Sequence, residues 1–297
     1  MAKPSLLIDS SIYIFQYYFS LPDNWYSENE SWPTAAVYGY TTFLVRLLLE
    51  QQPQRVAACF DESLETCFRN EIYADYKCSR ALPDEGLAFQ LNACRTVTDL
   101  MGIQTYGSDR YEADDLLGSL YRKLVRTKAP IAILTRDKDL GQLIAREHDY
   151  LWDYAAEKKH FQEDIYKKFG VRADQMIDYL ALVGDTSDDI PGVPGIGPKT
   201  AQALLGNYGS LSILFENIES LSSLPLRGAK TLSPKLREHR EQIEIAQQLA
   251  KIIVTIPLIE RVSELKWKEP QWKKLEKFCH SMGFPRLFSR IRTLKSD

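Results

Sequence analysis

Three short apolar runs in this chain are each closely followed by an aspartate. The runs read as buried strands, and they cover residues 5–8, 56–60 and 131–134. Asp9, Asp61 and Asp137 fall just past their carboxyl ends. Because an open α/β sheet binds its ligands outside the carboxyl ends of its strands, this placement predicts a site at one edge of a parallel sheet.

Further acids stand in tight groups later in the chain, and they are Glu112, Asp114, Asp115, Asp139, Asp185 and Asp188. Carboxylates that pack near one another repel, and burying one costs several kcal/mol unless it is paired or coordinates a metal. Oxygen-only ligand sets suit Mg²⁺ or Mn²⁺, whereas Zn²⁺ normally recruits His or Cys. No paired His or Cys spacing occurs here, so the acids predict hard divalent cations.

Each group of acids also has a simpler interpretation. Glu112 begins a predicted helix that runs to about Arg126, and acids in a first turn complement the helix dipole. Glu112 and Asp115 nevertheless share a face of that helix, where like charges are unfavourable without a counterion. Asp137 and Asp139 alternate by two and could stand in a solvated turn. The recurrence of such groups at successive strand ends favours metal binding.

The composition is that of an ordinary soluble protein. With 297 residues, 44% of them hydrophobic, the chain can form one large domain or two unequal ones. No run approaches the ~18 apolar residues of a membrane span, and the chain enters its first strand without a signal-peptide core. The five cysteines show no CxxC spacing, as expected of reduced thiols. We therefore expect a cytoplasmic protein without a membrane partner.

The net charge of −3 argues at first against a nucleic-acid partner, because such domains usually carry a basic surplus. The balance changes once the grouped acids are treated as neutralised by metal. Without those acids, the rest of the 40 acidic residues are fewer than the 37 lysines and arginines. A nucleic-acid partner therefore remains admissible.

From Tyr166 onward the pattern is helical, with short breaks at glycines, which indicates an α-helical subdomain. A Gly/Pro-rich hairpin from Ile190 to Ala201 leads into one of these helices. Its small residues would let backbone amides approach a phosphate at the helix N-terminus, where Lys199 can pair with it. A nucleotide-binding loop is excluded, because Pro198 stands where that motif needs Lys. A plain helix-helix turn stays open as the simpler interpretation.

At these residues the chain resembles the 5′-nuclease family, which comprises flap endonucleases, phage 5′-exonucleases and the N-terminal nuclease domain of bacterial DNA polymerase I. The resemblance runs nearly end to end, in family order and spacing. It is carried by Leu7-Ile8-Asp9, Phe60-Asp61, the segment from Phe68-Arg69 to Arg80, Glu112-Ala113-Asp114-Asp115, Asp137-Lys138-Asp139 and Gly184-Asp185 through Ala201. The fold that it implies is α/β, with a mixed, mainly parallel sheet between helices as a PIN-like nuclease core.

The resemblance also implies how the chain is divided. The metal-dependent nuclease core is expected over residues 1–165, including a helical arch at about 70–101. A C-terminal α-helical subdomain with a helix-three-turn-helix element is expected over residues 166–297. Its helix-hairpin-helix, at about 184–206, would grip duplex DNA.

Metal ligands follow from the resemblance position by position. The first metal cluster is matched by Asp9, Asp61, Glu112, Asp114 and Asp115. The second is matched by Asp137, Asp139, Asp185 and Asp188. Two or more Mg²⁺ ions per active site are implied, for which Mn²⁺ can substitute.

Contacts to the substrate are implied in the same way. Tyr76, Lys77 and Arg80 match residues at the base of the arch that contact the scissile region. The two cations would stabilise transition-state charge and Tyr76 would stack on an unpaired base, although a solvated basic face is the simpler interpretation. Further DNA contacts are expected from Arg69, Gly192, Gly195, Gly197, Lys199 and Thr200. A K⁺ ion held by backbone carbonyls at the hairpin is also implied.

The implied activity is a Mg²⁺-dependent, structure-specific 5′-nuclease that cuts DNA at 5′ ends, flaps or single-strand/duplex junctions. Products would carry 5′-phosphate and 3′-hydroxyl ends, through a two-metal mechanism. No base-reading pattern is visible, so specificity should follow the shape of the DNA. We expect a monomer, and a DNA polymerase or ligase partner would be a separate chain.

Departures from the family pattern occur at Ser10, Gln16, Arg136 and Asp189. Ser10 and Gln16 replace a Gly and an Arg, which puts one expected phosphate contact in question. Two rival classes are disfavoured. The complete acid set argues against a protein that binds branched DNA without cutting it, and a haloacid-dehalogenase phosphatase would need Asp-x-Asp where Asp9 is followed by Ser10 and Ser11.

Overall fold

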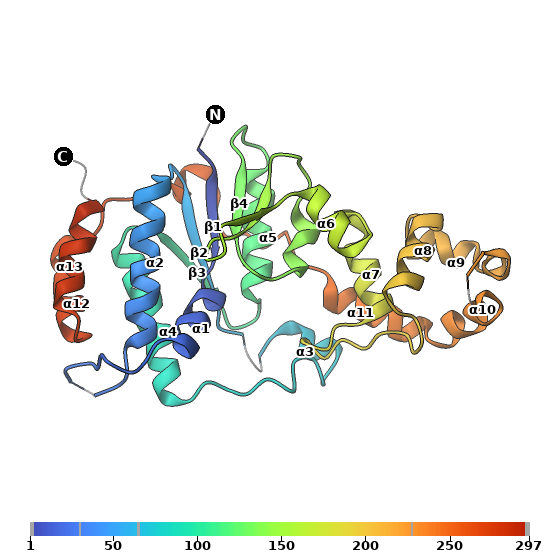
Figure 1. Ribbon diagram of the computed structural model, residues 1–297, viewed down its shortest axis with the longest axis horizontal. Coiled ribbons are helices and arrows are strands. Elements are labelled where there is room, and N and C mark those ends of the chain that lie inside the picture. The colour runs from blue at the N-terminus through green and yellow to red at the C-terminus, as the bar shows by residue number, and fades with distance from the viewer. Residues whose placement is uncertain (1–2, 30, 64–65, 227, 295–297) are drawn as a thin grey trace.

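The computed structural model describes residues 3–29, 31–63, 66–226 and 228–294, and its centre is a six-stranded sheet (Figure 1). The strands are β1 Ser5–Asp9, β2 Val56–Asp61, β3 Gln104–Ser108, β4 Ile131–Leu134, β5 Tyr150–Asp153 and β6 Lys158–His160. Their order is β3-β2-β1-β4-β5-β6, and only β6 runs antiparallel to its neighbour. The predicted mixed, mainly parallel sheet is therefore confirmed, and the three predicted strands occupy its middle.

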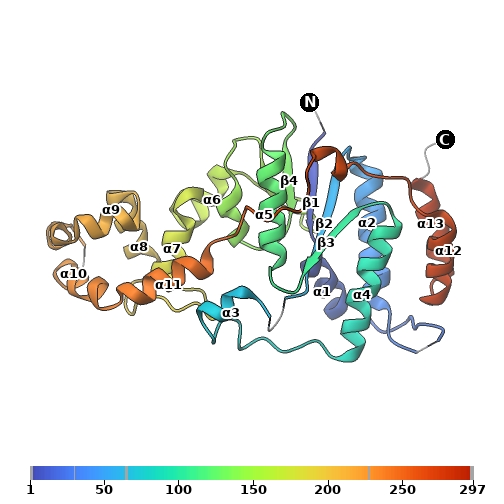
Figure 2. The ribbon, with the colours of Figure 1, turned by 180° about the vertical axis from the view of Figure 1, so that it is seen from behind.

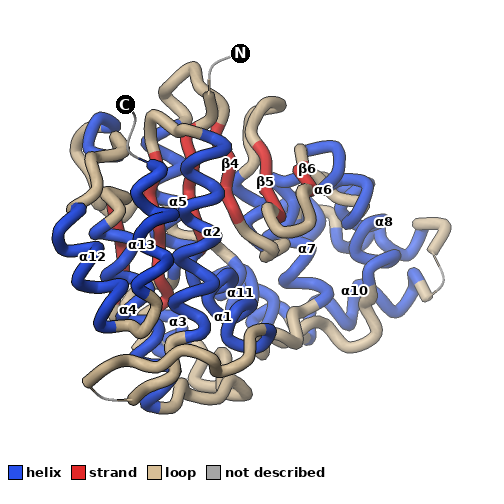
Figure 3. The backbone as a smooth tube through the Cα atoms, turned by 60° about the vertical axis from the view of Figure 1, so that its left-hand side comes forward, coloured by secondary structure: helices blue, strands red, loops and turns tan. Residues whose placement is uncertain are grey.

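The sheet separates two hydrophobic cores, because successive side chains of a strand point to opposite faces. Leu6 and Ile8 of β1 enter one core, and Leu7 enters the other. The first core is covered by α1 Ser10–Ser20, α2 Ala35–Gln51, α4 Glu85–Leu100, α12 Trp272–Ser281 and α13 Pro285–Ile291 (Figure 3). The second is covered by α5 Ala113–Leu124 and continues into the helices of residues 162–250. This layering is that of an α/β fold.

A helical extension leads away from the sheet, as Figure 1 shows. It is built from α6 Gln162–Phe169, α7 Met176–Val183, α8 Pro198–Tyr208, α9 Leu211–Glu216, α10 Ala229–Glu238 and α11 Arg240–Ala250. Short 3₁₀ helices are η1 Asp139–Leu143, η2 Ala173–Gln175, η3 Ile218–Ser223, η4 Val262–Leu265 and η5 Arg292–Leu294. The α-helical subdomain expected from Tyr166 onward is present, and its apolar residues join the second core.

The end of the chain differs from the expected division at residue 166. After α11 the backbone runs back past α5 to the sheet (Figure 2), where Arg55 and Lys266 form a β-bridge. Helices α12 and α13 then bury Leu275 and Leu287 against the α/β core. Sequence periodicity assigns these helices correctly as helices, but it carries no information about which body they pack on.

The arch is also shorter than the expected span of about 70–101. Helix α4 packs on α2 and β3, and its Gln90, Ala93 and Val97 are buried. The segment that crosses the carboxyl edge of the sheet is α3 Phe68–Ile72 followed by turns to Asp84, the N-cap of α4. Within the described ranges, no helix combines the length and the apolar character that crossing a membrane requires.

Candidate active site

The acids at the strand ends meet where the sheet topology places them. Strand β1 lies between β2 and β4, so the order of connections reverses there and a crevice opens at the carboxyl ends. Asp9 ends β1 and is the N-cap of α1. Its Oδ2 accepts a hydrogen bond of 2.8 Å from Thr135 Oγ1, just beyond β4. Asp61 ends β2, and its backbone N donates to Ser11 Oγ at 3.1 Å.

Burial and mutual repulsion raise the pKa of several of these acids. Burial, followed by the charges of Asp137 and Asp61, raises the pKa of Asp9 to about 7. Burial and the charges of Asp137 and Asp9 raise the pKa of Asp114 well above its ordinary value. These carboxylates therefore lie close enough to repel, which is the electrostatic condition that a bound cation relieves.

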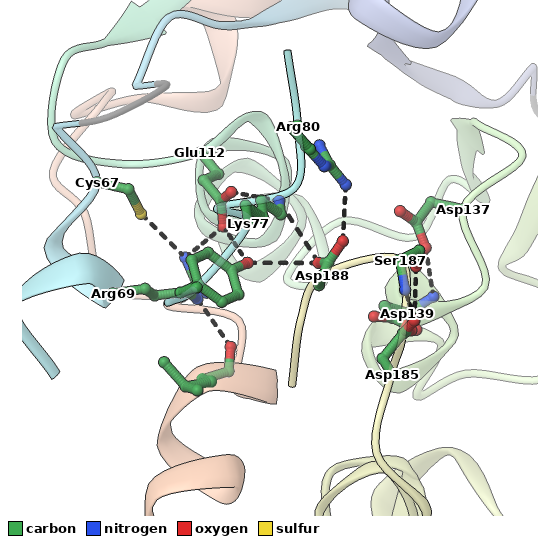
Figure 4. A network of polar contacts seen from close by, with 12 residues as sticks. Cys67, Arg69, Lys77, Arg80, Glu112, Asp137, Asp139, Asp185, Ser187 and Asp188 are labelled. Carbon is green, nitrogen blue, oxygen red and sulfur yellow. Dashed lines mark hydrogen bonds and ion pairs between the residues drawn. The ribbon is translucent and has the colours of Figure 1, made fainter. Parts of the chain in front are cut away.

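The second group of acids comes from two loops, one after β4 and one after α7. Asp137 Oδ1 accepts from the Asp139 backbone N at 2.8 Å, and burial with the charges of Asp137 and Asp185 raises the pKa of Asp139 to about 8. Asp185 accepts hydrogen bonds from the backbone N and Oγ of Ser187. It also forms an ion pair with Lys138, whose Nζ lies 2.7 Å from Asp185 Oδ2. These contacts outweigh burial and lower the pKa of Asp185. Figure 4 shows Asp137, Asp139 and Asp185 together, with Asp188 between them and Glu112.

Two cations of the arch base point into the acids. Lys77 Nζ contacts Glu112 and lies 3.5 Å from Asp188 Oδ2, while Arg80 Nη2 donates to Asp188 Oδ1 at 2.7 Å (Figure 4). A cavity of 410 Å³ opens beneath them and is also lined by Asp61. The two cations therefore lie against Glu112 and Asp188, two of the acids predicted to serve metal ions, and Arg80 is the more exposed of the two cations.

Arg69 does not lie on a DNA-facing surface, contrary to the expectation for it. It is 2% exposed, and its guanidinium donates to Glu112 at 2.9 Å and to both oxygens of Asp115 at 2.7 and 2.8 Å. Its remaining donors reach the carbonyls of Leu249 and Lys251 at 2.8 Å each. All five N–H groups are thus used inside the protein, which leaves none for a phosphate.

Asp115 likewise lacks a free oxygen for a metal. Its side chain is fully buried, and besides Arg69 it accepts from the backbone N of Ile253 at 2.8 Å and of Glu112 at 3.2 Å. Arg69 therefore supplies the counterion that the Glu112 and Asp115 pair needs. The spacing of Glu112 and Asp115 in the sequence shows that they need a counterion. It does not show which residue supplies it, because Arg69 lies on α3 and only the fold brings α3 to the start of α5.

Tyr76 is too buried to stack on a base in the way expected. It is 4% exposed, and its hydroxyl donates to Glu112 Oε2 at 2.9 Å. The same hydroxyl lies 3.4 Å from Asp188 Oδ2. Its aromatic ring belongs to the core beneath the site. Tyr76 thus lies in the cavity wall and orients acids from both groups.

The arrangement of the acids suits hydrated metal ions better than directly bound ones. Over the residues that the structure describes, no three or more His, Cys, Asp or Glu side chains are arranged to hold an ion directly. Asp139 Oδ1 is nevertheless buried without a hydrogen-bond partner, and the neighbouring carboxylates repel one another. Mg²⁺ keeps several of its waters and needs only one or two direct carboxylates. The residues present therefore fit hydrated hard cations.

The Gly/Pro hairpin joins α7 to α8, and its glycines have different surroundings. A Cβ at Gly192 would stand 2.2 Å from the carbonyl oxygen of Val183, so this glycine allows close backbone packing. Gly195 has a φ of 76°, and the Cβ position of Gly197 meets nothing within 4 Å. Lys199 is exposed and Thr200 half-buried in the first turn of α8. Gly197 and Lys199 therefore form the approachable part of the hairpin.

The four departures have distinct structural consequences. Ser10 is buried and its Oγ accepts from Tyr40 at 2.9 Å, while Gln16 Oε1 is buried without a partner. Arg136 Nε lies 3.5 Å from Asp153 Oδ2, so its partner is not Asp137. Asp189 binds Ser79. Sequence reasoning gave no role to Thr135, Ser187 or Lys138, although each stands within two residues of a grouped acid and that proximity was the available signal.

The α/β fold and the acids gathered at its strand ends are those of a nuclease, and comparisons with known proteins agree. The model of the "5'-3' exonuclease, N-terminal resolvase-like domain" matches residues 4–170, and that of the "5'-3' exonuclease, C-terminal SAM fold" matches residues 171–273. The chain belongs to the 5′-3′ exonuclease family. This membership confirms the resemblance identified from the motifs.

Individual relatives span most of the chain. A 5′-3′ exonuclease of Buchnera aphidicola subsp. Schizaphis graminum is 33% identical over 283 residues, covering 95% of this chain and 97% of the relative. The DNA polymerase I of Pseudomonas aeruginosa is 36% identical over 282 residues, covering 95% of this chain but 30% of the polymerase. The chain thus matches one complete exonuclease and about a third of a polymerase.

Solved structures share the fold at low sequence identity. T5 5′-exonuclease with bound zinc ions superimposes with a TM-score of 0.66 at 17% identity, covering 98% of both chains. The catalytic core of Rad2 in complex with DNA substrate also gives a TM-score of 0.66 at 17% identity, covering 99% of this chain and 93% of that core. These similarities confirm the fold class.

Proposed function

We propose that this 5′-3′ exonuclease family member is a Mg²⁺-dependent, structure-specific nuclease that cuts DNA at 5′ ends, flaps and single-strand/duplex junctions. The observation that carries the proposal is a cavity that is lined by Asp61 and Glu112 together with Lys77 and Arg80. The acids at the carboxyl ends of β1 and β4 lie close enough to Asp61 to repel it and one another. The same site would release 5′-phosphate and 3′-hydroxyl ends. Mn²⁺ would replace Mg²⁺, because both prefer oxygen ligands.

The acids divide into two ligand sets in this proposal. Asp9, Asp61, Glu112 and Asp114 would serve one ion, and Asp137, Asp139, Asp185 and Asp188 the other, directly or through water. Asp115 leaves the ligand set, because Arg69 and backbone N–H groups occupy both of its oxygens. Bound divalent ions would supply charge stabilisation and an activated water.

The basic residues act on the substrate phosphates. Lys77 and Arg80 lie beside Glu112 and Asp188, where they can compensate negative charge that develops on the scissile phosphate. Tyr76 holds Glu112 and Asp188 from below through its hydroxyl. Lys77 and Arg80 would therefore contact the phosphate, whereas Tyr76 would orient the carboxylates.

The hairpin would hold the duplex away from the cut. Its exposed residues Gly195, Gly197 and Lys199, with Thr200 behind them, can approach a phosphate backbone through amide and charge contacts. Such contacts carry no base information, so the shape of the DNA would set specificity. Backbone carbonyls of the same turn would hold a K⁺ ion. We further propose a cytoplasmic monomer that works with a separate polymerase or ligase.

A labelled 5′-flap substrate tests this function. The protein should release a labelled flap in the presence of Mg²⁺ and release nothing in the presence of a chelator. Asp139→Asn should abolish release, whereas Lys128→Ala should retain it, because Lys128 precedes β4 at the opposite edge of the sheet. Release by Asp139→Asn at the wild-type rate, or an intact flap with wild-type protein and Mg²⁺, would refute the proposal.

A further inference from the structure

Two segments that are far apart in the chain lie against each other beside the site. The first, residues 76–80, carries Lys77 and Arg80. The second, residues 185–190, is closed by backbone hydrogen bonds between Asp185 and Ile190 of 2.9 and 2.8 Å. Those bonds place Asp188 and Asp189 at the apex of a tight turn. The apex is therefore a firm surface for the first segment.

Asp189 makes the contact between these segments that involves no acid of either proposed ligand set. Its Oδ2 accepts two hydrogen bonds from Ser79, one from the backbone N at 3.0 Å and one from Oγ at 2.7 Å. Ser79 stands two residues after Lys77 and immediately before Arg80. The carboxylate thus fixes the backbone from which both cations project.

Each of the two segments contains one residue in a strained backbone conformation, which contacts with the other segment stabilise. Lys77 has a φ of 54°, in the left-handed region that costs a non-glycine residue free energy. Its backbone N donates to the Asp188 carbonyl at 3.1 Å, upstream of the Ser79 contact. Asp189 itself has a φ of 54°, a conformation that Asp tolerates better than most residues. Each strained residue is therefore held by the other segment.

We propose that Asp189 is a positioning residue, which acts through Ser79 to hold Lys77 and Arg80 over the reacting phosphate. The inference rests on the nuclease function proposed above. Asp189 would touch neither substrate nor metal. Losing its carboxylate should let residues 77–80 leave the strained conformation, so that the cations meet the phosphate less often while duplex binding at the hairpin persists.

Single-turnover cleavage of a 5′-flap substrate with Mg²⁺ tests this role. Asp189→Ala should lower the maximal rate about ten- to a hundredfold, the size expected when a reacting geometry is misplaced. The Kd for the substrate should change less than about twofold, because the phosphate contacts of the hairpin remain. Asp189→Asn keeps an acceptor for Ser79 and should restore most of the rate. Asp75→Ala, an exposed acid of the same arch segment, is the matched control and should cleave like wild type.

A second comparison separates positioning from a general loss of structure. In a Lys77→Ala/Arg80→Ala background, adding Asp189→Ala should change the rate little, because the groups that it positions are gone. A full additional loss in that background would overturn the proposal, as would a wild-type rate for Asp189→Ala. Should Asp189→Ala fail to fold, Ser79→Ala removes the Oγ half of the contact and should lower the rate in the same direction by a smaller factor, and a wild-type rate for it would then overturn the proposal. A wild-type protein that leaves the flap intact would instead refute the nuclease function itself.

Discussion

At the scale of single residues, acids that look alike in the sequence have opposite roles in the structure. Asp115 is fully buried and accepts hydrogen bonds on both oxygens, chiefly from Arg69. Asp139 is also buried, but its Oδ1 has no partner. A carboxylate of the first kind stabilises the fold, and one of the second kind destabilises it until a cation arrives.

The two acids should therefore respond oppositely to neutralisation. Asp115→Asn should lower the free energy of unfolding by about 3 kcal/mol or more, because it leaves the buried Arg69 without its bidentate partner. Asp139→Asn should leave the metal-free stability unchanged or higher, because it removes a repelled charge. Urea denaturation of the metal-free proteins measures both values. Equal stability losses would contradict the assignment of Asp115 to the Arg69 ion pair.

The stability of the metal-free protein should depend on pH. Asp9 and Asp139 have folded pKa values of about 7 and about 8, above the ordinary value of 3.8. From about pH 4 to about pH 8 these two carboxyl groups keep protons in the folded state that they have lost in the unfolded state. The free energy of unfolding therefore falls as the pH rises through this range. The melting temperature in chelator should be higher at pH 6 than at pH 8.5, and saturating Mg²⁺ should reduce the difference. A melting temperature that rises with pH would contradict the repulsion.

At the scale of elements, short segments between helices carry the chemistry. The turns from Tyr73 to Asp84 present Lys77 and Arg80, and the hairpin between α7 and α8 presents Lys199. The hairpin packs against a helix, because Gln242 Nε2 of α11 donates to the Gly192 carbonyl at 2.8 Å. Loops on a rigid scaffold commonly carry function in this way.

Alanine at Lys77 or Arg80 should affect the chemical step more than binding. Both cations lie at the cavity beneath the arch segment, where charge develops during hydrolysis. Single-turnover rates at saturating DNA should fall by about a hundredfold or more, while the Kd changes less. Lys128→Ala is the control and should leave both quantities unchanged. A loss confined to affinity would assign the two cations to binding alone.

Lys199→Ala should weaken duplex binding uniformly across sequences. Removing one phosphate contact should lower the slope of log affinity against log salt by about 0.9, because one fewer counterion is released from duplex DNA. Fluorescence anisotropy over a range of salt concentrations measures the slope, again with Lys128→Ala as the control. Binding to single strands should change little. An unchanged slope on duplex DNA would mean that the hairpin is only a helix-helix turn.

At the scale of the whole molecule, the last helices of the chain return to the α/β core that its first strands form. Helices α12 and α13 pack against the first core, on the side of the sheet that α2 and α4 cover (Figure 3). Between them and α11, residues 251–261 run along α5, where Ile253 N donates to Asp115 and Ile256 N donates to Ser119 Oγ. The end of the chain therefore supports the α/β core and the start of α5.

A core substitution in α12 should thus destabilise the nuclease without altering its chemistry. Leu275 is fully buried, and Leu275→Ala should lower the free energy of unfolding by about 2–5 kcal/mol. Ile213 of α9 is 47% exposed, and Ile213→Ala should cost about 0.5 kcal/mol or less. At a temperature where both variants are folded, their single-turnover rates should match wild type. A lower rate for folded Leu275→Ala would show that α12 also shapes the site.

The sequence by itself determined the central strands, the acids at their carboxyl ends, the helical second half and the hairpin. Those features depend on local periodicity and on short-range spacing, and each strand places its last residue at the same sheet edge. The motifs also identified the family correctly, because its acids recur in a fixed order. Lys77, Arg80 and the acids of both groups were placed at one site for the same reason.

Tertiary structure alone decided which of these residues are free to act. Arg69 and Asp115 satisfy each other only because the fold brings α3, α5 and the end of α11 together. Tyr76 turns its ring into the core, α4 joins the α/β layer instead of an arch, and α12 returns to the sheet. A local pattern states what a side chain can do, but its partners come from segments distant in sequence, and a buried polar group is defined by those partners.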